Sequence, residues 1–228
     1  MKIKNTMNKL DKLILERLQR SNEDAIKLVK QNGMLLKYVR EQTPEICLAA
    51  VKQNGNAIQF VIRRNKKLYL AAITTNPECL GLIEQTPELC LAAVKKNAWA
   101  IRYVKVQTPE ICLAAVKKNP NTLGDVKVQT HEICLAAVEA DGRVLYMVKN
   151  QTPEICEAAV KQTITALEYA EYQTDEMCLR VCTIHGGYLE YVKVKTPEIC
   201  LAAYLSRNYA IDFMNTKEKT ALLNLLRS

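Results

Sequence analysis

Apolar and polar residues follow one another along this chain in a pattern that repeats about every 22 residues. The pattern is clearest at residues 107–116, which read QTPEICLAAV. Within each repeat, apolar residues recur three and four positions apart, which is the spacing of a helix face and not of a strand. Counted from the glutamine as position 1, each repeat has 22 residues, except for one of 21. The repeats begin at Arg20, Gln42, Arg64, Gln85, Gln107, Gln129, Gln151, Gln173 and Lys195.

Three signals place the start of a first helix at the same point of each repeat. Position 2 is always Ser, Thr or Asn, whose side chains accept a hydrogen bond from a free N–H of the first helical turn. Position 3 is usually Pro, which suits the first helical residue, and position 4 is usually Glu, which interacts favourably with the helix dipole. Asn and Gly or Pro at positions 13 and 14 should end the helix, because Asn and Gly tolerate the left-handed conformation and Pro cannot continue a helix. We therefore expect a first helix of about ten residues.

Apolar residues at positions 16, 17 and 20, with a frequent aromatic residue at position 19, predict a second helix of about two turns. Such a short helix is marginal on its own, so it must pack on its neighbours. In the first helix, positions 5, 6, 7, 9 and 10 are apolar in nearly every repeat. Positions 4, 8 and 11 are predicted to face solvent, because Lys27 and Arg180 occupy position 8. A helix that is apolar around most of its circumference is buried on several sides.

These features predict an all-α fold, namely an α-solenoid of about nine short helix-turn-helix repeats in which each repeat rests on the next. Capping helices are expected at both ends, the second of them opened by Thr216 as N-cap. We expect a single repeat domain over 1–228, made of a capping helix in 1–19, repeats in 20–216 and a capping helix in 217–228.

Seven of the nine cysteines occupy position 6. Equivalent positions on stacked helices lie ~8–10 Å apart, farther than the ~7 Å that a disulfide allows. We therefore expect free thiols that act as small buried apolar side chains, in a reducing compartment.

Two other groupings could carry chemistry. Cys178, Cys182 and His185 form a C-x3-C-x2-H cluster, but a zinc site needs a fourth ligand or water and the sequence offers no fourth residue. His131 and Cys134 could suggest a Cys–His nucleophile, but this thiol should face the core, whereas reactive cysteines are exposed. We predict no catalytic, cofactor-binding or metal-binding residue, and no enzyme activity.

The net charge is +8, and basic side chains recur at positions 11 and 21, near the ends of the two helices. Cations there complement the helix dipole, which is one explanation for them. The alternative is a basic stripe that binds nucleic acid or another polyanion. The glutamates at position 4 lie on the same ridge as the position 11 lysines and argue against nucleic acid. We expect a protein partner of unknown identity.

Positions 15 and 18 differ most from repeat to repeat and lie one turn apart on the second helix. A constant frame with a changing exposed row is how repeat arrays carry recognition, although unselected surface drift would give the same variation. Trp, Tyr and Arg are the usual anchors of interfaces. The predicted partner-binding residues are Trp99, Arg102, Arg143, Tyr146, Tyr188 and Tyr209.

Residues 42–61, which begin QTPEICLAAVKQNG, resemble a family of tandem 22-residue repeats known as domain of unknown function 4116. The resemblance extends over about residues 20–216 and weakens in the repeats that begin at Arg64 and Gln173, and local irregularity is expected in the first of these two. Because such repeats are frequent in giant DNA viruses and in some intracellular bacteria, the resemblance implies a viral or pathogen protein that acts in the host cytoplasm. It implies no catalytic residue. We expect a monomeric, non-catalytic scaffold for protein–protein interaction, without a cofactor and without a membrane span.

Overall fold

The computed structural model describes residues 9–227, and in this range it contains 11 α-helices, nine 3-10 helices and no strand. The all-α fold predicted from the periodicity is therefore confirmed. Residues 1–8 of the expected N-terminal capping helix, and Ser228 at the other end, lie outside the described residues.

Each repeat starts with an α-helix of ten residues, which is the predicted length. These helices are α2 (Asn22–Gln31), α3 (Pro44–Gln53), α4 (Lys66–Thr75), α5 (Pro87–Lys96), α6 (Pro109–Lys118), α7 (His131–Ala140), α8 (Pro153–Gln162), α9 (Asp175–Ile184) and α10 (Pro197–Ser206).

The second helix of each repeat is a 3-10 helix of six residues. Six residues complete two turns at three residues per turn, and hydrogen bonds between residues i and i+3 suit such short pieces. These helices are η1 (Gly33–Tyr38), η2 (Gly55–Phe60), η3 (Pro77–Leu82), η4 (Ala98–Tyr103), η5 (Pro120–Asp125), η6 (Gly142–Met147), η7 (Ile164–Tyr169), η8 (Gly186–Tyr191) and η9 (Asn208–Phe213).

The junction between the two helices differs from the expectation of a left-handed residue. Asn54 ends α3 in an extended conformation, with φ −145° and ψ 112°. Its backbone N–H donates to the Ala50 carbonyl at 2.9 Å, and its side-chain oxygen accepts from the Asn56 N–H at 3.0 Å. One residue thus ends the α-helix and caps the 3-10 helix. At the other end of α3, the Thr43 hydroxyl accepts from the Ile46 N–H at 3.3 Å, which confirms the predicted N-cap.

The core comes from the same positions in successive repeats. In α3, Ile46, Cys47, Ala50 and Val51 at positions 5, 6, 9 and 10 are buried. Position 17 of the 3-10 helices and position 20, which directly follows each of them, complete this core. Position 7, which was expected to be buried, is half-buried in most repeats, as at Leu48, and exposed at Leu70 and Leu179.

The half-burial of position 7 has a geometric reason. Together with position 8 it lines the shallow groove between one α-helix and the next, as Leu135 and Ala158 do between α7 and α8. Glycine at position 14 reflects another close approach. A Cβ at Gly142 would overlap the carbonyl oxygen of Ala159 in the α-helix of the following repeat.

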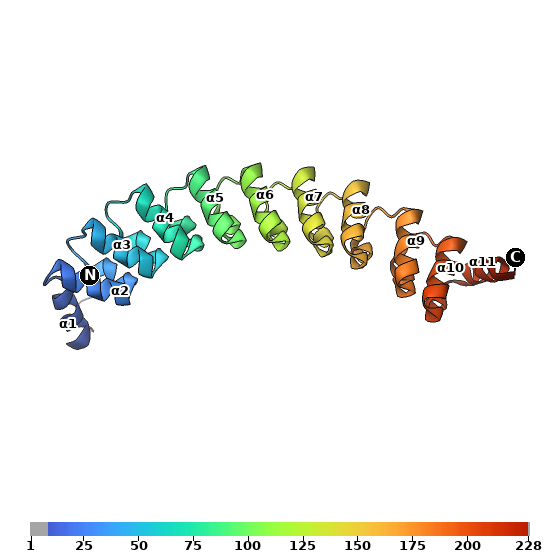
Figure 1. Ribbon diagram of the computed structural model, residues 1–228, viewed down its shortest axis with the longest axis horizontal. Helices are drawn as coiled ribbons and strands as arrows, with labels where there is room; N and C mark the ends of the chain where they lie inside the picture. Colours follow the sequence, from blue (N-terminus) through green and yellow to red (C-terminus); the bar gives the residue numbers. More distant parts are fainter. Residues whose placement is uncertain (1–8, 228) are drawn as a thin grey trace, which may run out of the picture. The chain divides into compact units, whose positions relative to one another are not determined.

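The chain forms two compact units, residues 1–118 and residues 119–228, called here the N-terminal and C-terminal units. Within the N-terminal unit, α2, α3, α4 and α5 each contact the next α-helix, and η1, η2 and η3 each contact the next 3-10 helix (Figure 1). Within the C-terminal unit, α7 contacts α8, α9 contacts α10, and η5 to η9 form a continuous series. Each unit is therefore a solenoid of stacked repeats with a row of 3-10 helices along one side.

Helices α1 (Lys9–Leu18) and α11 (Thr216–Arg227) flank the repeats and contact α2 and α10. The N-cap of α11 is Asn215, so the assignment of Thr216 was wrong. The Asn215 side chain accepts from the Glu218 N–H at 2.9 Å, and its own N–H donates to the Glu218 carboxylate at 2.7 Å. This reciprocal pair is a capping box, which Thr216 lies one residue too late to form.

The irregularity expected in the repeat that begins at Arg64 is confined to a connection. Helices α4 and η3 keep the usual lengths, and the Asn65 side chain caps α4 by accepting from the Leu68 N–H at 3.0 Å. The missing residue falls after η3, where Ile83 has φ −120° and ψ 164°. The equivalent Val61 after η2 has φ −71° and ψ 124°.

Candidate functional site

The row of 3-10 helices carries the side chains that differ between repeats. Position 18 is exposed in every repeat, and position 15 is exposed or half-buried. The position 18 residues are Lys37, Gln59, Gly81, Arg102, Gly124, Tyr146, Glu168, Glu190 and Asp212. The structure therefore places both predicted recognition positions at the surface, on 3-10 helices whose positions 16 and 17 are mostly buried.

Two of the predicted partner-binding residues form a stacked pair in the N-terminal unit. The Arg102 guanidinium lies 4.2 Å from the centre of the Trp99 ring on η4. Because the two residues are three apart on a 3-10 helix, their side chains lie on the same side. The indole is half-buried and the arginine is exposed, so the pair presents a flat surface with one positive charge.

Two others lie on η6 in the C-terminal unit. Arg143 is held by its own junction residue, because Nε and a terminal nitrogen of the guanidinium donate to the two carboxylate oxygens of Asp141 at 3.0 and 2.8 Å. This contact lowers the pKa of the Asp141 carboxyl. Tyr146 is 58% exposed, and its ring centre lies 5.7 Å from that of Tyr169 on η7.

Tyr188 and Tyr209 belong to the last two repeats and have different surroundings. Tyr188 occupies position 16, which usually faces the core, and is half-buried between the rings of His185 and Tyr191, at 5.5 and 5.9 Å. Tyr209 is 44% exposed and packs edge-on against Phe213 at 6.3 Å.

Position 19 adds exposed aromatic residues that sequence reasoning left out of the site. Tyr38, Tyr103, Tyr169 and Tyr191 are 37–43% exposed. The signal that could have found them is the charged residue that precedes each ring at position 18: lysine, arginine or glutamate.

The repeated glutamine at position 1 joins the start of a repeat to its end, a role that sequence reasoning missed. The Gln151 side chain donates to the Tyr169 carbonyl at 3.0 Å and accepts from the Glu171 N–H at 2.9 Å. It also reaches the Leu145 carbonyl of the preceding repeat at 3.4 Å. Gln42, Gln129 and Gln173 make the equivalent bonds. We call this contact the glutamine clamp, and it fixes the backbone that carries position 19.

All nine cysteines are free and buried, as predicted. At position 6 the thiol also donates to the clamp, as from Cys156 to the Gln151 side-chain oxygen at 3.1 Å. Burial raises the pKa of these thiols, and it raises the pKa of Cys182 to about 12. Protonated, buried thiols are poor nucleophiles and poor metal ligands.

The two groupings that could have carried chemistry are used otherwise. His131 Nε2 lies 3.0 Å from the Glu154 carboxylate on the next α-helix, while Cys134 donates to Gln129 at 3.9 Å. His185 lies at the junction between α9 and η8, and its buried Nδ1 has no hydrogen-bond partner. Over residues 9–227, no three His, Cys, Asp or Glu side chains are grouped so as to hold a metal ion.

Several cations, two of them in the basic ladders, contact groups of the chain itself. Lys161 and Arg180 approach the Glu157 carboxylate at 3.8 and 2.9 Å, and Lys193 Nζ donates to the Glu171 carbonyl at 2.8 Å. These contacts reduce the positive potential that a polyanion would meet on the C-terminal unit.

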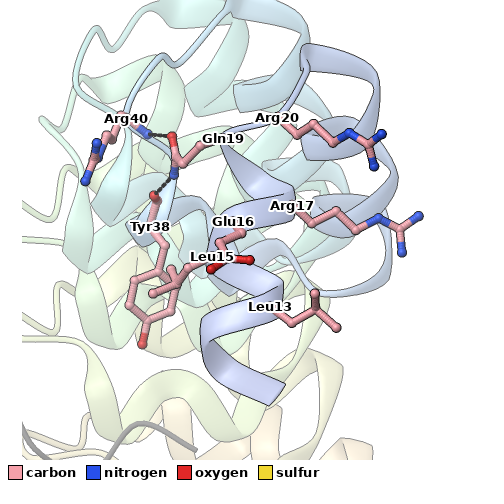
Figure 2. A pocket seen from close by; sticks show the side chains of 8 residues that line it. All are labelled: Leu13, Leu15, Glu16, Arg17, Gln19, Arg20, Tyr38 and Arg40. Carbon is pink, nitrogen blue, oxygen red and sulfur yellow. Dashed lines mark hydrogen bonds between the residues drawn. The ribbon is translucent and has the colours of Figure 1, made fainter. Parts of the chain in front are cut away.

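A cavity of about 870 Å³ lies beside α1 and η1 in the N-terminal unit (Figure 2). The Gln19 side chain organises it, because Nε2 donates to the Tyr38 carbonyl at 2.7 Å and the Arg40 N–H donates to Oε1 at 3.4 Å. The lining residues are Leu13, Leu15, Glu16, Arg17, Gln19, Arg20, Tyr38 and Arg40. None of the predicted partner-binding residues lines this cavity.

Among residues 9–227, no helix has the length and apolar character needed to cross a lipid bilayer. No curated protein and no solved structure matches the chain. The model of a domain of unknown function, DUF4116, matches residues 22–62. This match covers most of the first two repeats, and the QTPEICLAAVK phrase within it recurs unchanged at residues 107–117. Residues 22–62 of this helical repeat protein are therefore similar to the family described as domain of unknown function DUF4116.

Proposed function

We propose that this protein is a non-catalytic repeat scaffold that binds other proteins through the exposed row of its 3-10 helices. One observation carries the proposal. The buried positions and the glutamine clamp recur almost unchanged, whereas position 18 is exposed in every repeat and differs in charge and size from one repeat to the next. A surface without a role in folding that presents Trp, Tyr and Arg side chains suits protein recognition.

A protein partner is favoured over nucleic acid by the surroundings of the cations. Arg143 is paired with Asp141, and Lys161 with Glu157. Binding to a phosphate backbone depends on cations that are available to neutralise it. The exposed aromatic residues of the row lie next to carboxylates in the last three repeats, which would repel a polyanion.

The test is a crosslinking pull-down that compares the wild type with a Trp99→Ala plus Arg143→Ala variant. A Lys52→Ala plus Lys95→Ala variant is the matched control, because these exposed lysines belong to the basic ladder and not to the row. We expect the row variant to lose specific partners that the ladder variant keeps. Electrophoretic mobility of DNA and RNA is measured in parallel at several salt concentrations. Loss of partners in the ladder variant alone, together with salt-dependent nucleic-acid binding, would contradict the proposal.

A further inference from the structure

The last three repeats carry the same pair of side chains at positions 18 and 19, an acidic residue followed by an aromatic one. We call these pairs the acidic–aromatic row, which consists of Glu168, Tyr169, Glu190, Tyr191, Asp212 and Phe213 on η7, η8 and η9. The three carboxylates are exposed, Tyr169 is 42% exposed, Tyr191 is 37% exposed, and Phe213 is half-buried. The 3-10 helices η7, η8 and η9 contact one another in turn, so the pairs follow one another along one surface.

The N-terminal unit shows what these aromatic rings accommodate. In the first repeat, position 18 is Lys37, and its ammonium nitrogen lies 4.6 Å from the centre of the position 19 ring of Tyr38. In the fourth repeat, position 18 is Arg102, which lies over Trp99. The chain thus places its own cation against a ring at this point of the repeat, an arrangement that the ring quadrupole stabilises. In the last three repeats a carboxylate takes the place of that cation, which leaves these rings for a cation of another molecule.

The carboxylates and rings of the row act on one another across repeats. Glu168 raises the pKa of Tyr169 on its own helix and that of Tyr191 on the next, and Glu190 adds to the effect on Tyr191. The basic ladder residue that follows η8 is directed elsewhere, because Lys193 Nζ donates to the Glu171 carbonyl at 2.8 Å. The row is therefore a locally negative surface with aromatic faces on a chain whose net charge is +8.

We propose that the acidic–aromatic row docks an extended peptide segment that carries a lysine or arginine at every third residue. Each cation would lie against one ring and one carboxylate, as Lys37 lies against Tyr38 within the chain. The spacing follows from the stacking, because packed helices lie ~8–10 Å apart and three residues of an extended polyproline-type segment span about 9 Å. This proposal names the kind of partner and rests on the proposed function of the protein as an interaction scaffold.

The probe is a fluorescent heptapeptide with lysine at its first, fourth and seventh positions and alanine and proline between them. A second peptide of the same composition has its three lysines adjacent. Fluorescence anisotropy with the full chain at physiological salt should show tighter binding of the spaced peptide. A Glu168→Gln, Glu190→Gln, Asp212→Asn variant should bind it roughly tenfold more weakly, because each exposed ionic contact contributes a small part of the affinity.

A matched control removes the same number of charges elsewhere, with Glu45→Gln, Glu110→Gln and Glu198→Gln on exposed sites of the α-helices. This control should change the affinity less than about twofold. A further pair of variants separates ring from carboxylate. The Tyr169→Phe, Tyr191→Phe variant should still bind the spaced peptide, since the rings remain. The Tyr169→Leu, Tyr191→Leu variant should bind it more weakly.

Peptide binding that is weakened equally by the Glu168→Gln, Glu190→Gln, Asp212→Asn variant and by the matched control would overturn the proposal, because it would mean unspecific attraction to charge. Equal affinity for the two peptides, or no binding of either, would also overturn it. If the wild type still captures partners that depend on Trp99 and Arg143, only the kind of partner assigned to the row is wrong. If that capture fails as well, the proposed function is wrong too.

Discussion

Replacement of Gln151 by methionine should destabilise the C-terminal unit, although this residue lies at the edge of the core and carries no charge. Its side chain makes four contacts that methionine cannot make: to the Tyr169 carbonyl at 3.0 Å, more weakly to the Leu145 carbonyl at 3.4 Å, from the Glu171 N–H at 2.9 Å and from the Cys156 thiol at 3.1 Å. Methionine has a similar length and is flexible, so the change removes hydrogen bonds while it keeps most of the packing.

The expected loss follows from the bonds. Each backbone hydrogen bond contributes about 1 kcal/mol, and a polar group left without a partner costs somewhat more when water reaches it poorly. The thiol contact adds a smaller amount. Together these give a decrease of about 2–3 kcal/mol in the free energy of unfolding. Gln59→Met is the matched control, because Gln59 is exposed and donates only to the Asn56 carbonyl, at 3.0 Å. It should cost no more than about 0.5 kcal/mol.

Urea unfolding followed by circular dichroism measures the free energies, and hydrogen exchange at the Glu171 amide reports the clamp directly. In Gln151→Met this amide should exchange much faster than in the wild type, because its acceptor is gone. If Gln151→Met proves no less stable than Gln59→Met, or if the Glu171 amide keeps its protection, the clamp does not hold the repeat together.

Three further variants test other contacts of the frame. Arg207→Asn should raise the free energy of unfolding, measured in the same urea titration, by about 1 kcal/mol. The reason is that Arg207, at position 13, does not provide η9 with the side-chain cap found in other repeats. No gain in stability would contradict the role given to position 13. Gly142→Ala should lower it by about 1–3 kcal/mol, because the new methyl group meets the Ala159 carbonyl, and a stable variant would refute that close approach. Cys182→Val tests the buried thiol. Since burial raises the folded-state pKa of Cys182 from 9.0 to about 12, its contribution is complete below pH 9 and is lost as the pH rises toward 12. Between pH 8 and pH 10.5 the wild type should therefore lose about 1–2 kcal/mol more stability than Cys182→Val, and equal losses would exclude this thiol as the cause.

The features that the sequence predicted correctly are those that local chemistry decides. A hydroxyl or amide before a proline and a glutamate can cap a helix without any help from the rest of the fold, and Thr43 does so. The burial of Cys47 and its equivalents likewise follows from apolar spacing alone. Repetition strengthened both inferences, because an accidental pattern does not recur in register nine times.

The features that were missed depend on distances across the repeat. Apolar residues at positions 16, 17 and 20 fit an α-helix and a 3-10 helix alike. Only the position of the Asn54 cap favours the 3-10 helix. Gln151 meets the backbone 18 and 20 residues away, which no local pattern reveals. The exposure of Tyr169 and Tyr191 likewise depends on packing between successive repeats, because η7 and η8 contact each other.

The most direct test of the account is hydrogen exchange of the full chain, followed by mass spectrometry, with and without the spaced-lysine heptapeptide. If the acidic–aromatic row is a recognition surface carried on a separate frame, the peptide should slow exchange in fragments that contain η7, η8 and η9 and should leave η1 to η4 unchanged. Slower exchange in the N-terminal unit instead, or the same profile with and without the peptide, would contradict the account.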